Sequence, residues 1–371
     1  MQSGTAGKTA EAMGSVILDN EAGGVRAGVG IIETSHGNHG MFRRLRSLFL
    51  LSLVLVSIAA GMGVWWSRQP MDLPEAIEFT INPGTGAYGA GQSAAAAGVP
   101  LPAILFAVLA RASGRAAQLK AGSYAVEPGI TPWQLLDKIA RGAVLQFSLV
   151  IPEGWTFRQM RAAIESSTQL NATLAGQGER AILGAIAAQE THPEGLFFPD
   201  TYVFSRGLAD VELYRQAYRS QQQRLTAAWA ARAPDLPLKS PYEALILASI
   251  IEKETGRAED RTQISAVFIN RLRLGMPLQT DPTVIYGLGQ SFDGNLRKQH
   301  LRTDNAYNTY RRGGLPPTPI ALPGAASLSA ALHPAASQAL YFVARGDGSS
   351  VFSNTLDDHN RAVNTYQRRR P

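Results

Sequence analysis

The clearest periodic pattern in the chain is a run of apolar positions at helical spacing that ends on a carboxylate. Leu247, Ile250, Ile251 and Glu254 recur at positions i, i+3, i+4 and i+7, so they share one face of a predicted helix. Glu252 points away from that face. Desolvation of Glu254 on the apolar face would raise its pKa, which prepares a general acid for neutral pH. In an alternative, Glu254 reaches solvent at the helix end and pairs with a nearby basic side chain.

A second helix is predicted for residues 261–274. Ile264, Val267, Phe268 and Arg271 fall on one of its faces. This pattern indicates that the helix packs back against the helix of Glu254.

Two loops of short polar and aromatic side chains follow this pair of helices. The first loop comes just before Pro282, and the residue before a proline is held extended. Its candidate sugar-binding residues are Gln279, Thr280 and Asp281, and those of the second loop are Tyr307, Asn308 and Tyr310. We interpret both loops as surface groups that hydrogen-bond a carbohydrate. A turn in which Asp281 caps the following helix is compatible with that interpretation.

The N-terminal part of the chain changes character at Met41. Residues 1–40 are rich in glycine and lack sustained periodicity, which is typical of a disordered tail. Residues 47–66 carry no charge, and about 20 such residues suffice to span a bilayer as a helix. The pattern predicts one transmembrane helix, and a cleaved signal peptide is the alternative.

The charges that flank this apolar run indicate its orientation. Arg43, Arg44 and Arg46 precede it, whereas only Arg68 follows closely. Because cytoplasmic flanks carry the excess of Lys and Arg, residues 1–46 are predicted to be cytoplasmic, and everything after Gln69 is predicted to lie on the extracytoplasmic side of the inner (plasma) membrane.

From about residue 77 to 160, one pattern occurs three times: a β-rich run, a Pro/Gly turn, and a Thr that opens a helix. In the second copy, Thr131 is a predicted N-cap, Pro132 the first helical residue, and Gly142 the stop. Small α+β modules of this kind either bind a ligand or only orient a neighbouring domain.

Two further segments lead to specific expectations. The aromatic run at 195–204 is interpreted as a buried strand, with Tyr202 also considered for a cleft wall. Near the C-terminus, a hairpin is predicted to turn at 346–349, followed by a helix capped by Asp357 or Asp358.

Composition narrows the possible functions. A chain of 371 residues with 45% hydrophobic residues can form two or three compact units. The net charge of +6 is spread along the chain, which disfavours nucleic acid as a partner. There is no Cys, and the six His residues form no metal-binding motif, so we expect no metal and no cofactor. The sequence also lacks the motifs of esterases, penicillin-binding acyl transferases and P-loop NTPases, which leaves carboxylate chemistry on a sugar.

Several motifs, in order and spacing, resemble those of the YceG-like (MltG) family of endolytic murein transglycosylases. They are IIEKET, FINRL, LQTDPTVIYG, AYNTY, GLPP, PG and HP, all C-terminal to residue 240. The resemblance implies an α+β fold with a single transmembrane helix, a LysM-like module at 77–145 that binds glycan, and a catalytic domain at 146–371. It also implies that Glu254 is the catalytic acid.

The resemblance implies cleavage of the MurNAc–GlcNAc bond inside nascent peptidoglycan strands near the membrane, with 1,6-anhydro ends as product. One carboxylate suffices for that reaction, since Glu254 can serve first as acid and then as base. Glu252 is a further candidate for binding the substrate, and the alternative is that it only pairs with a nearby Arg. Peptidoglycan synthases are candidate partners. Two alternatives remain: a lysozyme-like hydrolase that uses Asp281 as second carboxylate, and a membrane-tethered glycan-binding scaffold without catalysis.

Overall fold

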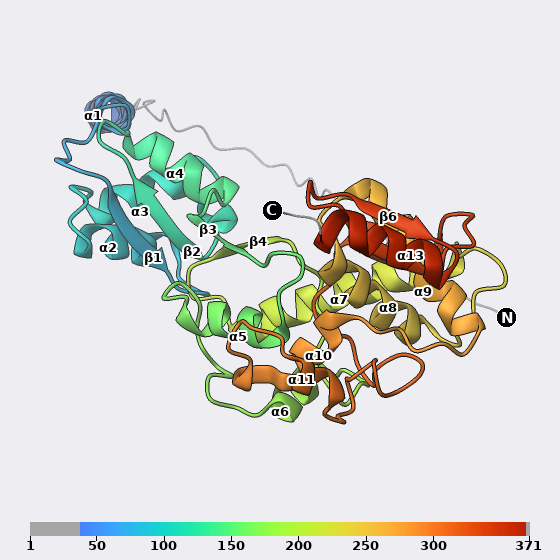
Figure 1. The fold of residues 1–371 in the computed structure, drawn as a ribbon. Helices are drawn as coiled ribbons and strands as arrows, with labels where there is room; N and C mark the ends of the chain where they lie inside the picture. The colour runs from blue at the N-terminus through green and yellow to red at the C-terminus, as the bar shows by residue number, and fades with distance from the viewer. Residues whose placement is uncertain (1–37, 369–371) are drawn as a thin grey trace, which may run out of the picture. The chain divides into compact units, whose positions relative to one another are not determined.

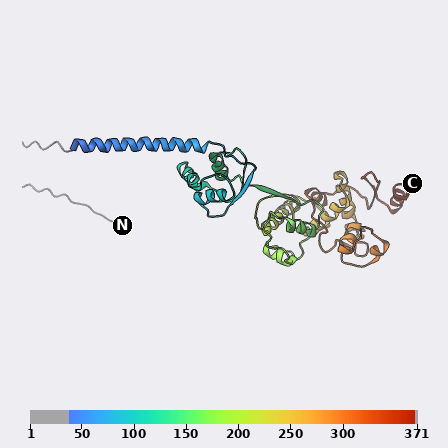
Figure 2. The same ribbon diagram turned by 90° about the vertical axis from the view of Figure 1, so that its left-hand side faces the viewer.

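The computed structural model describes residues 38–368, and the chain divides into two compact units, residues 1–64 and 65–371. The expectations for residues 1–37 lie outside the described residues. Helix α1, Asn38–Ser67, is seen end-on in Figure 1 and along its length in Figure 2. An 18-residue window within its segment Met41–Ser67 has a mean hydropathy of 2.3, so the helix is long and apolar enough to cross a membrane.

The predicted mixed α+β architecture with small sheets is confirmed. After α1, the first elements are β1 (Ile77–Ile81), α2 (Ala87–Ala96), α3 (Ala103–Ala112), a 3₁₀ turn (Ala116–Gln118), β2 (Gly122–Val126) and α4 (Pro132–Arg141). Strands β1 and β2 pair antiparallel. They share an apolar cluster with α2, α3 and α4, whose largest buried side chains include Phe106 and Tyr124.

Helix α4 begins and ends where the sequence predicts. The Thr131 hydroxyl accepts from the Gln134 backbone N–H at 3.1 Å, and the Gln134 side chain accepts from the Thr131 backbone N–H at 2.9 Å. Pro132 occupies the first turn, and Gly142 adopts the left-handed conformation with φ 73°. This reciprocal cap fixes the start of the helix because it satisfies two otherwise unpaired backbone donors.

The remaining elements surround a second and larger apolar cluster. They are β3 (Gln146–Val150), α5 (Phe157–Ser166), α6 (Glu179–Ala185), β4 (Thr201–Ser205), α7 (Asp210–Ala230), α8 (Pro241–Glu254), α9 (Ala258–Arg273), α10 (Asp281–Leu288), a 3₁₀ turn (Gly289–Ser291), α11 (Lys298–Arg302), α12 (Ala325–Leu332), β5 (Tyr341–Ala344), β6 (Ser350–Ser353), α13 (Leu356–Val363) and a π-helical turn (Asn364–Arg368). Strand β3 pairs with β4, and β5 with β6, both antiparallel.

Helix α8 lies at the centre of this cluster, in contact with α7, α9, α10 and α12. Ser240 caps it by accepting from the Glu243 backbone N–H at 3.3 Å. Every residue from Ala244 to Ile251 is buried, so the helix is enclosed on all sides up to its last turn. The sequence pattern had indicated one apolar face only. Glu254 is therefore the last residue of a largely buried helix, and this end of the helix reaches a cleft.

Some local expectations were wrong. The cap of α13 is Thr355, whose hydroxyl accepts from the Asp358 backbone N–H at 3.2 Å, and Asp357 and Asp358 lie inside the first turn. Asp281 is the first residue of α10 rather than its cap. Tyr202 is buried in the core and donates to the Phe198 carbonyl at 2.5 Å, so it forms no cleft wall.

Candidate active site

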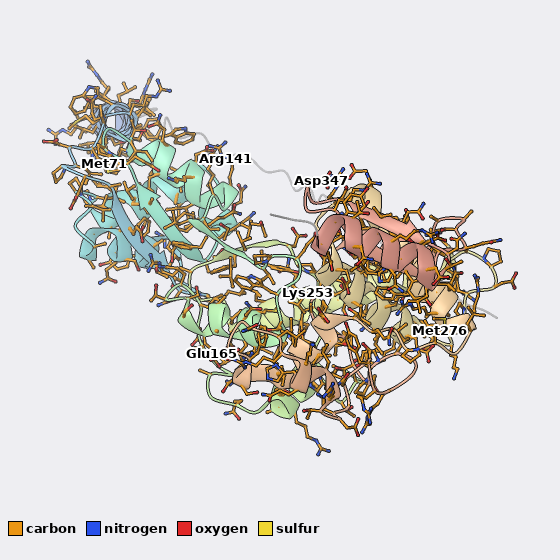
Figure 3. All side chains as sticks on the ribbon, viewed as in Figure 1. Met71, Arg141, Glu165, Lys253, Met276 and Asp347 are labelled. Carbon is orange, nitrogen blue, oxygen red and sulfur yellow. The ribbon has the colours of Figure 1, made fainter. Side chains whose placement is uncertain are left out.

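A cleft of about 510 Å³ opens at the C-terminal end of α8. Its walls come from α8, α9, the start of α10, the 306–310 loop, strand β5 and helix α13. Polar and charged groups in its lining are Glu254, Arg271, Gln279, Asp281, Tyr310 and His359. Lys253, the neighbour of Glu254, is labelled at the end of α8 in Figure 3 and donates to the Gly154 carbonyl at 3.1 Å, outside this cleft.

The two carboxyl oxygens of Glu254 differ in their surroundings. Oε1 accepts a hydrogen bond from the Thr280 hydroxyl, whereas Oε2 has no hydrogen-bond partner among residues 38–368. Burial raises the pKa of Glu254 to about 7, the Thr280 hydrogen bond opposes that rise, and the charge of Asp281 adds to it. Near neutral pH this carboxyl can therefore both give and take a proton, as the sequence pattern predicts for its environment.

Thr280 is held by two other buried threonines. Its backbone N–H donates to the Thr309 hydroxyl at 3.1 Å, and the Thr283 hydroxyl donates to the Thr280 carbonyl at 2.8 Å. The hydroxyls of Thr283 and Thr309 lie 2.8 Å apart. Because all three residues are buried, the hydroxyl that contacts Glu254 is fixed in place before any substrate arrives.

Gln279 lines the cleft with a strained backbone. Its φ of 51° lies in the left-handed region, which a residue with a side chain adopts at a cost of about 1 kcal/mol or more. Two contacts support it: its N–H donates to the Thr309 carbonyl at 3.1 Å, and its Oε1 lies 3.4 Å from Nη1 of Arg271. The strained residue directly precedes Thr280. The hydrogen bonds that hold Gln279 in this conformation therefore help to determine the shape of the cleft wall.

Asp281 and Tyr310 come together at the edge of the same cleft. The Tyr310 hydroxyl donates to Oδ1 of Asp281 at 2.7 Å. Burial, followed by this hydrogen bond, raises the pKa of Tyr310 above its ordinary value, so the hydroxyl keeps its proton. The structure thus brings Glu254 and four of the predicted loop residues, 279, 280, 281 and 310, to one site.

Arg271 is a further cleft residue that the sequence pattern placed on a packing face only. It is buried, and its Nε donates to the Leu340 carbonyl at 2.7 Å and its Nη1 to the Leu278 carbonyl at 2.9 Å. Its guanidinium carbon lies 5.2 Å from the centre of the Tyr341 ring. No carboxylate forms an ion pair with it in the described part of the chain. The sequence did contain a signal for Arg271 as a site residue: it lies on the buried face of a predicted helix, and a buried charge requires a partner.

Three predicted site residues lie elsewhere. Asn308 is fully buried; its Nδ2 donates to the carbonyls of residues 300, 301 and 303, and its Oδ1 accepts from the Tyr310 N–H at 3.0 Å. The Tyr307 hydroxyl forms a hydrogen bond of 2.9 Å with the Thr318 hydroxyl, in which either group can be the donor. Tyr307 lines a different cavity. Glu252 accepts from the Gly324 N–H at 3.0 Å. Asn308 is thus an internal support of its loop, contrary to the expectation of a surface group.

The described residues contain no group of three or more His, Cys, Asp or Glu side chains that could hold a metal ion.

The chain is similar to several known proteins. The sequence profile of the YceG-like family matches residues 79–365. A protein of Bacillus subtilis (strain 168) named endolytic murein transglycosylase is 34% identical over 268 residues, covering 68% of this chain and 74% of that protein. The protein of that name from Streptococcus pneumoniae (strain D39) is 26% identical over 354 residues, covering 85% of this chain and 64% of that protein.

Among solved structures, a YceG-like protein of Listeria monocytogenes matches with a TM-score of 0.47 and 28% identity, covering 78% of this chain and 99% of that one. The family profile extends over most of the chain and includes every residue of the Glu254 cleft named here. The chain therefore belongs to the YceG-like family.

Proposed function

We propose that this chain is a membrane-anchored endolytic murein transglycosylase. It cleaves the β-1,4 bond between MurNAc and GlcNAc inside nascent peptidoglycan strands and leaves 1,6-anhydro-MurNAc ends. The observation that carries the proposal is the Glu254 carboxyl: its pKa is raised to about 7, one oxygen is fixed by Thr280, and the other faces no protein donor. The names of the relatives from Bacillus subtilis and Streptococcus pneumoniae agree with this class of reaction.

In the first step, protonated Glu254 donates its proton to the glycosidic oxygen while the bond from that oxygen to the anomeric carbon breaks. The GlcNAc strand leaves with a free hydroxyl. Positive charge develops at the anomeric carbon, and the nearby carboxylate of Asp281, held by Tyr310, stabilises it electrostatically.

In the second step, the 6-hydroxyl of the same MurNAc residue attacks its own anomeric carbon, and Glu254 takes the proton from that hydroxyl. The carboxyl returns to its starting state, and no water enters the product. A carboxyl with a pKa near 7 suits both steps, since neither protonation state is strongly disfavoured at neutral pH.

The remaining parts of the chain serve to bring the cleft to its substrate. Helix α1 anchors the protein with residues 1–46 in the cytoplasm, because the basic flank precedes the apolar run. Residues 77–145 form a LysM-like module that holds the glycan, and residues 146–371 form the catalytic domain. The anchor confines the protein to the membrane, where peptidoglycan synthases, its proposed partners, extend new strands.

A lysozyme-like hydrolase is the second candidate, favoured by one observation: Asp281 lines the same cleft as Glu254. In that reaction a second carboxylate supports attack by water, and the product carries an ordinary reducing end. The two candidates therefore differ in the mass of the new end by one molecule of water.

The proposal is tested by incubating the full chain, in detergent micelles, with uncrosslinked glycan strands and determining the masses of the products. We expect cuts within the strands and 1,6-anhydro ends. Reducing ends would favour the hydrolase, and intact strands in the presence of folded protein would favour a glycan-binding scaffold.

A further inference from the structure

A second cavity, of about 660 Å³, lies on another side of α10 and takes no part in the proposed reaction. It is bounded by the first turn of α5, the 192–194 segment, the C-terminal half of α10 and the 306–310 loop. Its most informative lining residues are Arg158, Glu179, His192, Glu194, Tyr286 and Tyr307.

Glu194 is at the base of this cavity and only 3% exposed. Its Oε1 accepts from the Phe157 N–H at 2.9 Å, and its Oε2 accepts from the Tyr286 hydroxyl at 3.0 Å. Burial raises the pKa of Glu194 to about 7 against the effect of these hydrogen bonds. The Gly195 N–H also hydrogen-bonds to this carboxyl. A carboxylate offers about four acceptor positions, so after these three donors one position remains that can accept an N–H group from a ligand in the cavity.

The mouth of the cavity carries charges of both signs. Arg161 is engaged by Glu165 at 2.8 Å, whereas Arg158 is exposed and has neither an ion pair nor a hydrogen bond within residues 38–368. Glu179 and His192 line the same space. Arg158 and Glu194 line the same cavity, and a ligand that carries both carboxylate and N–H groups complements the two. In a peptide-bearing strand the lactyl carboxyl of MurNAc is bound in an amide, so the free carboxylates belong to the peptide.

The same two chain segments line both cavities. Helix α10 contributes Asp281 to the Glu254 cleft and Tyr286 to the second cavity, and the 306–310 loop contributes Tyr310 to the cleft and Tyr307 to the second cavity. At about 1.5 Å of rise per residue, the five steps along α10 correspond to roughly 7 to 8 Å. A branched substrate seated in the cleft can therefore extend a substituent toward the second cavity.

We propose that the second cavity binds the peptide that peptidoglycan strands carry on their MurNAc residues, with Arg158 pairing a peptide carboxylate and Glu194 accepting a peptide N–H. This inference rests on the proposed function and specifies which part of the substrate the enzyme recognises besides the sugars. Arg158 is then a specificity-determining residue that takes no part in bond cleavage.

The test compares two substrates of matched strand length, one with its peptides and one stripped of them by an amidase, using the full chain in detergent micelles. The stripped strand keeps a free lactyl carboxylate on each MurNAc and lacks the peptide carboxylates and N–H groups, so an effect on it would report binding of the glycan itself. Arg158→Glu should raise KM for the peptide-bearing strands about fivefold to tenfold, as expected for loss of a charge-assisted hydrogen bond at a partly exposed site. It should leave KM for the stripped strands and kcat for both substrates unchanged.

Arg219→Glu is the matched control, because Arg219 is an exposed arginine on α7 that lines neither cavity. It should change neither substrate. Equal effects of Arg158→Glu on both substrates would contradict peptide binding and assign the cavity to the glycan, and no effect on either would contradict it as well. Failure of the proposed function is distinguishable, since the unmodified protein would then produce no anhydro ends from either substrate.

Discussion

Burial has a similar effect on the pKa of two carboxyl groups in this protein, those of Glu254 and Glu194. Their hydrogen bonds and their positions at helix ends differ. Burial raises the pKa of each to about 7. Within residues 38–368, Glu254 has one oxygen without a hydrogen-bond partner, whereas Glu194 has both oxygens engaged, by the Phe157 N–H and the Tyr286 hydroxyl. The comparison teaches that a raised pKa makes a proton available, and that a free oxygen facing a cleft decides whether the group can deliver it.

The two carboxyl groups also lie at opposite kinds of helix end. Glu254 is the last residue of α8, where the partial negative charge of a helix end disfavours the carboxylate. Glu194 contacts the first N–H of α5, where the partial positive charge favours it. We infer that Glu194 has a supporting role for α5 and α10 in addition to the proposed peptide contact, while Glu254 is organised for proton transfer.

The largest expected effect comes from Glu254→Gln. The amide keeps the shape of the side chain and cannot supply a proton, so turnover should fall by about 100- to 10,000-fold. The thermal midpoint should stay close to that of the unmodified protein. Glu252→Gln is the matched control two residues away, on a side chain bonded to the Gly324 N–H, and should retain most of the rate. An active Glu254→Gln beside an inactive Glu252→Gln would reverse the assignment.

A second expectation concerns stability against pH. Both pKa values rise from 4.5 to about 7 on folding, so the folded chain binds these protons more tightly than the unfolded chain. Their contribution to stability is fully present below pH 4.5 and is lost as the pH rises through about 7, by on the order of 2 to 3 kcal/mol for each group. Thermal unfolding at several pH values measures this slope. Glu254→Gln and Glu194→Gln should each flatten it, and an unchanged slope in both would show that neither carboxyl is buried as described.

At neutral pH, Glu194→Gln should show whether Glu194 supports the fold or takes part in catalysis. The amide oxygen can accept from only one of the two donors, so if it keeps the Phe157 N–H, its nitrogen faces the Tyr286 hydroxyl, which has to change from donor to acceptor and rearrange its other contacts. We expect a loss of about 1 to 3 kcal/mol in the free energy of unfolding and little change in kcat. Full stability combined with loss of kcat would instead make Glu194 a member of the catalytic machinery.

The smallest effect is expected from Thr280→Val. The Thr280 hydroxyl bonds to Glu254 and lowers the pKa of that carboxyl, so its removal should raise the pKa further, by up to about one unit. Because Glu254 acts first as an acid, the alkaline limb of kcat/KM against pH should move to higher pH. Thr280→Ser retains a hydroxyl and should leave the profile in place. A shift to lower pH in the valine variant would contradict this account of the hydrogen bond.

The sequence allowed a correct prediction where chemistry depends on a local pattern. The helical spacing of Leu247, Ile250, Ile251 and Glu254 was enough to predict the raised pKa of the carboxyl, and the Thr131 and Gly142 signals predicted both ends of α4. These features are set by residues close together in the chain, so periodicity and capping preferences describe them.

Features that depend on contacts between distant segments were missed. Glu194 is organised by Phe157 and Tyr286, which are far from it in sequence, and nothing in its own segment, THPEGLFF, indicates these partners. Asn308 lies in a polar loop and was predicted to be exposed, yet its amide is enclosed because it satisfies the carbonyls at the end of α11. A polar side chain that replaces missing backbone partners cannot be told from a binding residue by its spacing alone.

The central claim, that Glu254 alone serves as acid and base without a water nucleophile, is tested most directly by running the reaction in water enriched in heavy oxygen. The full chain in detergent micelles is incubated with glycan strands, and the new MurNAc ends are analysed by mass spectrometry. The account predicts anhydro ends that carry no heavy oxygen, for the unmodified protein and for any residual activity of Asp281→Asn. Reducing ends labelled with heavy oxygen would contradict it, since they require attack by water on the anomeric carbon.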